Sequence, residues 1–241
     1  MEKQTPTEYL DDKQWSPLWE HFLSRATLFE PSAIHEISCI LPLPGRTGVL
    51  VFAESNIYFS PTTALKTLYH FSSFHSFSDY HVLASSLKQL GQFGKYKMPW
   101  VCPFFTLFPL TKKDKSIWIN PLKISKLVDD SENTYAQMSN GLCLLMPIGR
   151  RPVLKRAEMA CLILATIRRG MFHYILQGET PVDFLYLPAT PFAKTLSNRT
   201  CLQSFRTAIG QINRLYQITY SLHHCEPLIY DAQEIHRIDW I

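Results

Sequence analysis

The sequence has few of the features that identify enzymes, metal proteins or membrane proteins. It contains no GxSxG, P-loop, GxGxxG or HExxH motif. No two cysteines form a CxxC pair, which argues against a zinc or redox site. No uncharged run reaches the ~20 residues of a membrane span. The acidic first 33 residues lack the apolar core of a signal peptide. We therefore expect a soluble cytoplasmic protein, with no enzymatic activity, metal or cofactor.

Cysteine is sparse for a chain of 241 residues. A secreted disulfide scaffold is usually denser in cysteine. We interpret the six cysteines as buried free thiols, with a disulfide or a ligand role as the alternative. They are Cys39, Cys102, Cys143, Cys161, Cys201 and Cys225.

Apolar residues are plentiful, at 46%, and charged residues make up 18%. This composition supports a sizeable core and excludes disorder for most of the chain. The length allows one large domain or two small ones. We divide the chain into an acidic N-terminal arm (1–33), a core (34–178) and a C-terminal extension (179–241).

The first half of the core alternates strand and turn signals. Apolar residues at 34–41, 49–52 and 57–59 predict three strands, separated by turns at 42–45 and 55–56. A helix is expected after Pro61, with Ser60 as its N-cap. We expect 70–81 to form a structured loop. A short helix is expected over 82–90, ended by Gly91.

The second half begins with strands and ends with helices. Strands are expected at 100–102 and 104–108. A charged turn follows at 112–115, and a further strand is expected within 116–124. Asn140-Gly141 between two β-prone runs predicts a hairpin with a type I′ turn. A long helix is expected over 152–177, an extended segment over 180–191, and one or two helices over 193–222, with Gly210 as a weak point. These elements predict an α+β fold, with a mostly antiparallel sheet packed by helices and a helical C-terminal extension.

Three groups of residues have competing interpretations. Trp15, Trp19 and Phe22 have helical spacing, so the arm is either a docked cap, which we favour, or a mobile partner-binding segment. Histidines 70, 75 and 81 do not share a helical face, which favours a loop over a metal site. The only clusters with catalytic residue types are His35-Glu36 and residues 223–226 (HHCE). Neighbours in sequence rarely converge on one substrate atom, which argues against a catalytic role for either cluster.

Basic residues are concentrated in the middle of the chain. From 88 to 169 there are fourteen Lys or Arg against five Asp or Glu, while the rest of the chain is acidic overall. This asymmetry favours a surface that faces a polyanion, although an ordinary solvated face is the alternative. A helix N-terminus offers free backbone N–H groups and a positive dipole end, which suit phosphate. Turns and helix starts can line one edge of a sheet domain, where these basic clusters would converge. The candidate DNA-contacting residues are Lys95, Lys97, Lys112, Lys113, Lys115, Arg150, Arg151, Lys155, Arg156, Arg168 and Arg169.

Several short blocks occur in the order found in one known family. They are residues 57–66, 69–80, 97–101 (KMPWV), 106–109 (TLFP), 117–119 (IWI), 139–141 (SNG) and 146–147. In these blocks the chain resembles the ComK-type competence transcription factors, over roughly residues 34–187. The acidic arm and about forty C-terminal residues have no counterpart in that family.

The resemblance implies a DNA-binding transcription activator of DNA-uptake and recombination genes. Its partners would be A·T-rich double-stranded DNA, read mainly through the minor groove, further copies of itself on the DNA, and RNA polymerase, with a nucleoid-associated location. One segment resembles the family motif that an adaptor of the Clp protease recognises, which implies that the adaptor binds it. The alternative is an apolar strand that packs on the core. The segment consists of Phe184, Leu185, Tyr186, Leu187 and Pro188.

A regulator of a different class is the main alternative function. Such a protein would keep the ComK-type fold and act through protein partners without binding DNA. An uncharacterised enzyme ranks third. Binding to A·T-rich duplexes separates the first two.

Overall fold

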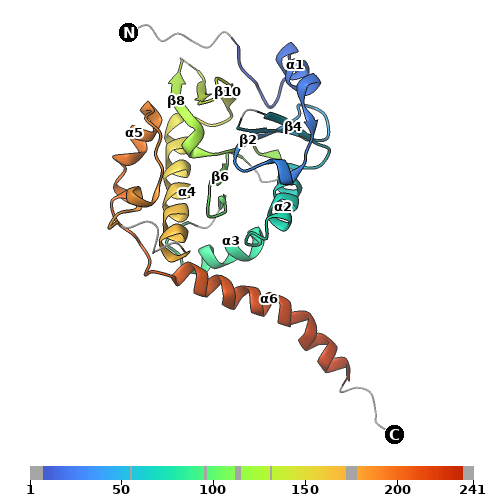
Figure 1. The fold of residues 1–241 in the computed structure, drawn as a ribbon, viewed down its shortest axis with the longest axis vertical. Coiled ribbons are helices and arrows are strands. Elements are labelled where there is room, and N and C mark those ends of the chain that lie inside the picture. Colours follow the sequence, from blue (N-terminus) through green and yellow to red (C-terminus); the bar gives the residue numbers. More distant parts are fainter. Residues whose placement is uncertain are drawn as a thin grey trace.

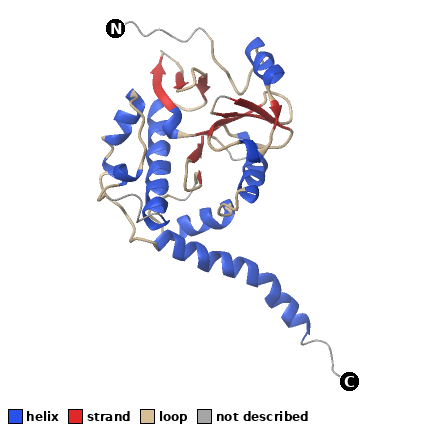
Figure 2. Ribbon diagram, viewed as in Figure 1, coloured by secondary structure: helices blue, strands red, loops and turns tan. Residues whose placement is uncertain are grey.

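A computed structural model describes residues 8–54, 56–94, 97–111, 115–130, 132–171 and 178–235. The strands form a seven-stranded sheet and a three-stranded sheet, and helices surround them (Figure 1, Figure 2). The predicted α+β fold, the mostly antiparallel pairing and the helical C-terminal region are confirmed. Across the described ranges, no helix combines the length and apolar content needed to span a membrane.

The elements alternate along the chain. The α-helices are α1 Pro17–Arg25, α2 Ala64–Phe74, α3 Tyr80–Gln89, α4 Arg150–Met171, α5 Pro191–Ser197 and α6 Gln211–Ile235. The 3-10 turns are η1 Pro31–Ala33, η3 Pro121–Lys123, η4 Pro181–Phe184 and η5 Thr200–Leu202. The strands are β1 Thr27–Leu28, β2 Ile37–Pro42, β3 Val49–Ala53, β4 Asn56–Ser60, β5 Trp100–Val101, β6 Thr106–Pro109, β7 Trp118–Ile119, β8 Ile124–Asp129, β9 Thr134–Met138 and β10 Cys143–Met146.

The large sheet has the order β1-β4-β3-β2-β7-β6-β5 and is antiparallel except between β1 and β4. Strands β2, β3 and β4 match the three predicted runs. Gly48 leads into β3 with φ of 107°, and a Cβ there would lie 2.7 Å from the Phe59 ring and 2.9 Å from the Ser60 carbonyl oxygen. Glycine at this position therefore allows β3 and β4 to pair closely.

Helix α1 docks the described part of the N-terminal arm onto the large sheet. Trp19 is buried, and its Nε1 donates to the Asp11 carbonyl at 3.0 Å. The Phe22 ring meets Phe52 of β3 edge-to-face, with centroids 5.2 Å apart. Leu10 adds a parallel bridge beside Leu144 of the small sheet. Residues 8–33 therefore form a docked cap, as favoured by the sequence.

The small sheet has the order β10-β9-β8, and its β9–β10 hairpin confirms the predicted pair of strands. The predicted type I′ turn is wrong. That turn needs positive φ at both central residues. Here Gly141 has φ of 87°, whereas Asn140 is not left-handed. The Asn140 Oδ1 accepts the Leu142 N–H at 3.2 Å, and the Gly141 N–H donates to the Met138 carbonyl at 3.1 Å. The left-handed glycine alone closes the turn.

Two predictions about residues 60–81 need correction. The N-cap of α2 is Thr63, whose Oγ1 accepts the Lys66 N–H, and not Ser60. Helix α2 continues to Phe74, so the expected loop shrinks to 75–79. Ser72 explains the continuation, because it is buried and accepts a hydrogen bond from Trp100 Nε1 at 2.9 Å. Asp79 then caps α3, accepting the His81 and Val82 N–H groups.

Helix α4 runs along the core and is the element against which the C-terminal segments pack. It begins at Arg150, two residues before the predicted start, and residues 172–177 of that prediction lie outside the described ranges. The segment 180–191 is not fully extended, because it contains η4. Gly210, with φ of 73°, precedes α6, so the expected weak point separates α5 and η5 from the last helix.

Candidate nucleic-acid interface

The first turns of α4 present two cations to solvent. Pro152 occupies the first turn, where its missing N–H costs nothing. Val153 and Ala157 are fully buried, so they fix the inner face of the helix. Arg151 and Lys155 are both exposed and lie four residues apart, on one outward face. The helix thus positions two side chains of like charge on a rigid element.

Arg156 points sideways from α4 and holds the end of β6. Its Nη1 donates to the Pro109 carbonyl at 3.1 Å and also to the Leu110 carbonyl. Burial lowers the pKa of this guanidinium. Arg156 is therefore a structural anchor, and it leaves the predicted DNA-contacting set. Because Arg156 bonds to the end of β6, the start of α4 lies beside the β6–β7 connection.

The β6–β7 connection carries a further exposed cation to this place. The Leu110 N–H donates to the Ile117 carbonyl at 3.0 Å, and the Thr111 N–H donates to Ser116 Oγ at 2.9 Å. These bonds hold the base of the connection, where Lys115 is exposed. Lys112 and Lys113, predicted for the same turn, lie outside the described residues.

Lys97, which precedes β5, belongs to the same neighbourhood. It is exposed and has φ of 57°. Partial desolvation lowers the pKa of Lys97, and the positive charge of Arg156 lowers it further. Trp100 of β5 pairs antiparallel with Leu107 of β6, so the segment before β5 lies beside the end of β6 that Arg156 holds. Lys95, the other cation predicted for this segment, lies outside the described residues. We call Lys97, Lys115, Arg151 and Lys155 the basic surface.

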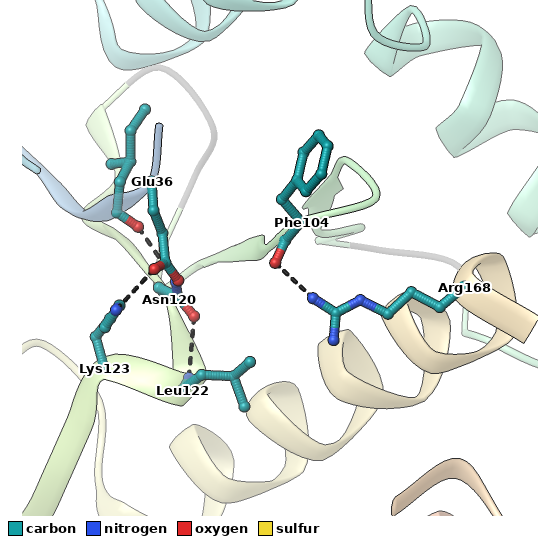
Figure 3. Close-up of polar contacts among 7 residues, drawn as sticks. Glu36, Phe104, Asn120, Leu122, Lys123 and Arg168 are labelled. Atoms are coloured by element: carbon teal, nitrogen blue, oxygen red, sulfur yellow. Dashed lines mark hydrogen bonds and ion pairs between the residues drawn. The ribbon is translucent and has the colours of Figure 1, made fainter. Parts of the chain in front are cut away.

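Arg168 is placed inside the protein and cannot face a phosphate in this fold. It is 5% exposed, and burial lowers the pKa of its guanidinium. It donates to the carbonyls of Pro103 at 2.8 Å and Phe184 at 2.9 Å. It also donates to the Phe104 carbonyl at 2.6 Å (Figure 3). The prediction that it contacts DNA is therefore corrected: it satisfies backbone acceptors of the β5–β6 turn and of η4.

Arg169 has a structural role as well. It donates to the Thr207 carbonyl, and its guanidinium lies 3.5 Å from the centroid of the Phe205 ring. Burial lowers its pKa. Arg169 and Lys155 are two heptads apart, so they lie on a similar face of α4. The segment around Phe205 covers the C-terminal end of that face, where it contacts Arg169. Only the N-terminal end of this helix contributes to the basic surface.

Acidic groups reduce the positive potential on one side of the α4 start. Arg150 pairs with Asp129 at 3.2 Å and donates to the Leu127 carbonyl at 3.1 Å. An open hollow of about 270 Å³ next to Gly149 is lined in part by Asp11, Asp12 and Glu132. We therefore place the anion-binding side of the basic surface toward Lys97 and Lys115, and keep Arg150 outside it.

A buried polar network was missed by the sequence analysis. Asn120 is fully buried, and its Nδ2 donates to Glu36 Oε1 at 3.0 Å and to the Ile37 carbonyl (Figure 3). Glu36 also pairs with Lys123 at 2.7 Å, and Asn120 Oδ1 accepts the Leu122 N–H. The network joins the start of β2 to η3. No pattern of spacing marks it, because Glu36 and Asn120 lie 84 residues apart in sequence.

The adaptor-like segment is only partly accessible. Phe184 is 2% exposed and its ring meets Phe205 edge-to-face at 5.5 Å, and Leu185 is also buried. Tyr186 is 68% exposed, while Leu187 and Pro188 are half-buried. An adaptor could therefore not reach the Phe184 or Leu185 side chain in the folded chain. Adaptor capture would require local opening.

The histidines lie in structural contacts. His75 Nε2 is 3.0 Å from the Pro31 carbonyl oxygen, His70 packs against Phe29, and His81 packs against Tyr69. Among the described residues, no three His, Cys, Asp or Glu side chains are grouped to hold a metal. Glu36 of the predicted 35–36 pair is engaged with Asn120 and Lys123. In the 223–226 cluster, the side chains of residues 225 and 226 lie outside the described part.

Comparisons with known proteins give no relative for this chain. No protein-family model matches it, and neither a curated protein nor a solved structure does. The functional argument consequently rests on the residues of this chain.

Proposed function

We propose that this protein is a sequence-specific DNA-binding transcription activator. It recognises A·T-rich double-stranded DNA through the minor groove, using the basic surface of Lys97, Lys115, Arg151 and Lys155. The observation that carries the proposal is that Arg156 joins the start of α4, which exposes Arg151 and Lys155, to the end of β6, whose connection to β7 exposes Lys115. The activation of competence genes, and the contact with RNA polymerase that activation needs, rest on the ComK-type sequence blocks.

The division of labour within the basic surface follows from position. Arg151 projects from the first turn of a rigid helix, and arginine is favoured in the narrow, electronegative minor groove of A·T-rich DNA. Lys97 and Lys115 come from loops and offer point charges suited to phosphates, which fix position without reading sequence. We therefore assign base-composition reading to Arg151 and anchoring to the three lysines.

Titration of labelled duplexes tests the proposal. We expect the full-length protein to bind an A·T-rich duplex more tightly than a G·C-rich one. The slope of log K against log salt should be about −0.9 for each phosphate neutralised. Arg151→Ala should reduce the preference for A·T-rich DNA, by an amount equivalent to roughly 1–3 kcal/mol. Lys115→Ala should weaken binding to both duplexes equally and flatten the slope by about 0.9.

Lys66→Ala is the matched control. Lys66 is also exposed, but it lies on α2, across the strands from α4 in Figure 1. Its removal should leave affinity, preference and salt slope unchanged. Absence of binding to either duplex, or equal losses in all three variants, contradicts the proposal. In that case the protein-partner regulator becomes the better description of this fold.

A further inference from the structure

Helix α6 carries an apolar stripe that does not face the body of the protein. Ile218 is 48% exposed and Leu222 is 66% exposed, while Leu215, one turn earlier, is half-buried. These positions are three and four residues apart, which is the a/d spacing of a coiled coil. We call Leu215, Ile218 and Leu222 the α6 seam; the helix backbone continues beyond them to Ile235.

A different face of α6 attaches the helix to the body. Ile212 is buried, and Tyr216 Oη accepts the Asp79 N–H at 3.1 Å. Gly170 of α4 lies against Gly210, where a Cβ would meet backbone at 3.3 Å. On a helix of 100° per residue, the seam is roughly a third of a turn away from this attachment face. The intramolecular contacts therefore leave the seam open.

The second half of α6 extends away from the rest of the fold in Figure 1. A helix without tertiary packing is marginal in water, because most helical stability in proteins comes from packing an apolar face. An apolar stripe with a/d spacing is suited to packing against another helix with the same spacing. A second copy of this chain supplies such a helix.

The charge of the seam also favours a second copy. Residues 215–224 contain no Lys, Arg, Asp or Glu. Two identical stretches can therefore approach without like-charge repulsion, and nothing in the stretch selects a partner of opposite charge. A two-fold contact is self-complementary, since the same patch is used twice.

We propose that two copies of this chain associate through the α6 seam. The proposal does not depend on DNA binding. Helix α6 is attached near the C-terminal end of α4, where Gly170 lies against Gly210, whereas Arg151 and Lys155 lie at the N-terminal end of α4. A 22-residue helix is about 33 Å long, so pairing leaves the basic surface of each copy free.

Measurement of mass in solution tests the proposal. Sedimentation equilibrium of the full chain should give twice the 27.9 kDa chain mass, with dissociation on dilution. Leu222→Lys should weaken the association at least tenfold, because it places a charge at an a position. Ile218→Lys should do the same. Gln217→Lys adds the same charge to the same helix on another face, and should keep the dimer.

Melting curves of all variants check that each is folded. We expect each variant to keep the folded state, because residues 217, 218 and 222 are exposed. A wild-type mass of one chain up to ~100 μM, well above common dimer affinities, overturns the proposal. Equal dissociation of the Gln217 and Leu222 variants also overturns it. The Leu222 variant should still shift a duplex carrying one A·T-rich box, so failure of the dimer and failure of DNA binding are separate results.

Discussion

Two aromatic residues of the adaptor-like segment lie two positions apart and should respond very differently to truncation. Phe184 is buried against Phe205, its carbonyl accepts from Arg168, and it lies on η4, which packs on α4. Tyr186 is 68% exposed, and its described ring contact is with the Arg168 guanidinium, 5.3 Å from the centroid. The pair separates a core role from a recognition role within one segment.

The magnitudes follow from burial. Truncating a buried Phe to Ala costs roughly 3–5 kcal/mol, because it removes apolar contacts and leaves a cavity. For a domain of this size, 1 kcal/mol shifts Tm by about 2–4 °C, so Phe184→Ala should lower Tm by roughly 6–20 °C. Tyr186→Ala loses at most an exposed cation–π contact of about 0.5–1 kcal/mol, and should lower Tm by no more than about 4 °C.

Thermal melts followed by circular dichroism, and urea midpoints with unchanged m values, check this prediction. Lifetime in a cell that has the Clp adaptor gives a second readout. A core role predicts that Phe184→Ala shortens the lifetime, because destabilised proteins are removed faster. A Phe184→Ala protein that melts within about 2 °C of wild type and lasts longer in the cell would refute the core assignment. That result would support adaptor recognition.

Three further predictions concern groups whose roles the structure defines. Arg168→Met should lower Tm by several degrees, because three carbonyls lose their donor at a cost of roughly 1–3 kcal/mol each in isolation, whereas Arg151→Met should not. Hydrogen bonds from Thr180 and Glu179 lower the pKa of Asp183, so its stabilisation is complete above about pH 4, the ordinary carboxyl pKa, and is lost as pH falls through the lower folded pKa. Asp183→Asn should therefore flatten the dependence of Tm on pH between 5 and 2, relative to wild type. Burial raises the pKa of Cys102 to about 12 and also raises the pKa values of Cys39 and Cys161, so mass-spectrometric mapping after thiol labelling at pH 8 should find these three unmodified in the native protein and modified in urea.

Local chemistry predicted the elements that depend on neighbouring residues. Strands β2, β3 and β4 follow from apolar runs separated by turn residues, and the β9–β10 hairpin follows from Asn140-Gly141. The docking of α1 followed from the spacing of Trp15, Trp19 and Phe22. In each case the determinant lies within about ten residues of the element that it specifies.

One error arises where a distant residue decides the local structure. The sequence predicts that Ser72 lies in a structured loop, yet Trp100, which is 28 residues away, donates to its hydroxyl within helix α2. The N-cap error is a local one: Thr63 replaces Ser60 as N-cap, and Thr67, seven residues after Ser60, donates to the Ser60 hydroxyl at 2.8 Å. A propensity for a loop or a cap is weak compared with a buried hydrogen bond to a partner that the sequence does not identify.

The same reasoning explains why the candidate DNA-contacting residues separated into two classes. Charge counting treats every arginine as solvated, because buried arginine is rare. It could not foresee that Arg156, Arg168 and Arg169 all donate to main-chain carbonyls. Arginine suits that role, since its planar guanidinium carries five donors and stays charged when buried. Helix α4 contacts strands, turns and other helices along its length, and these segments carry main-chain carbonyls at its flanks. The long arginine side chains of α4 reach these carbonyls. The cations that remain exposed are those at the helix start and on loops, where no later segment covers them.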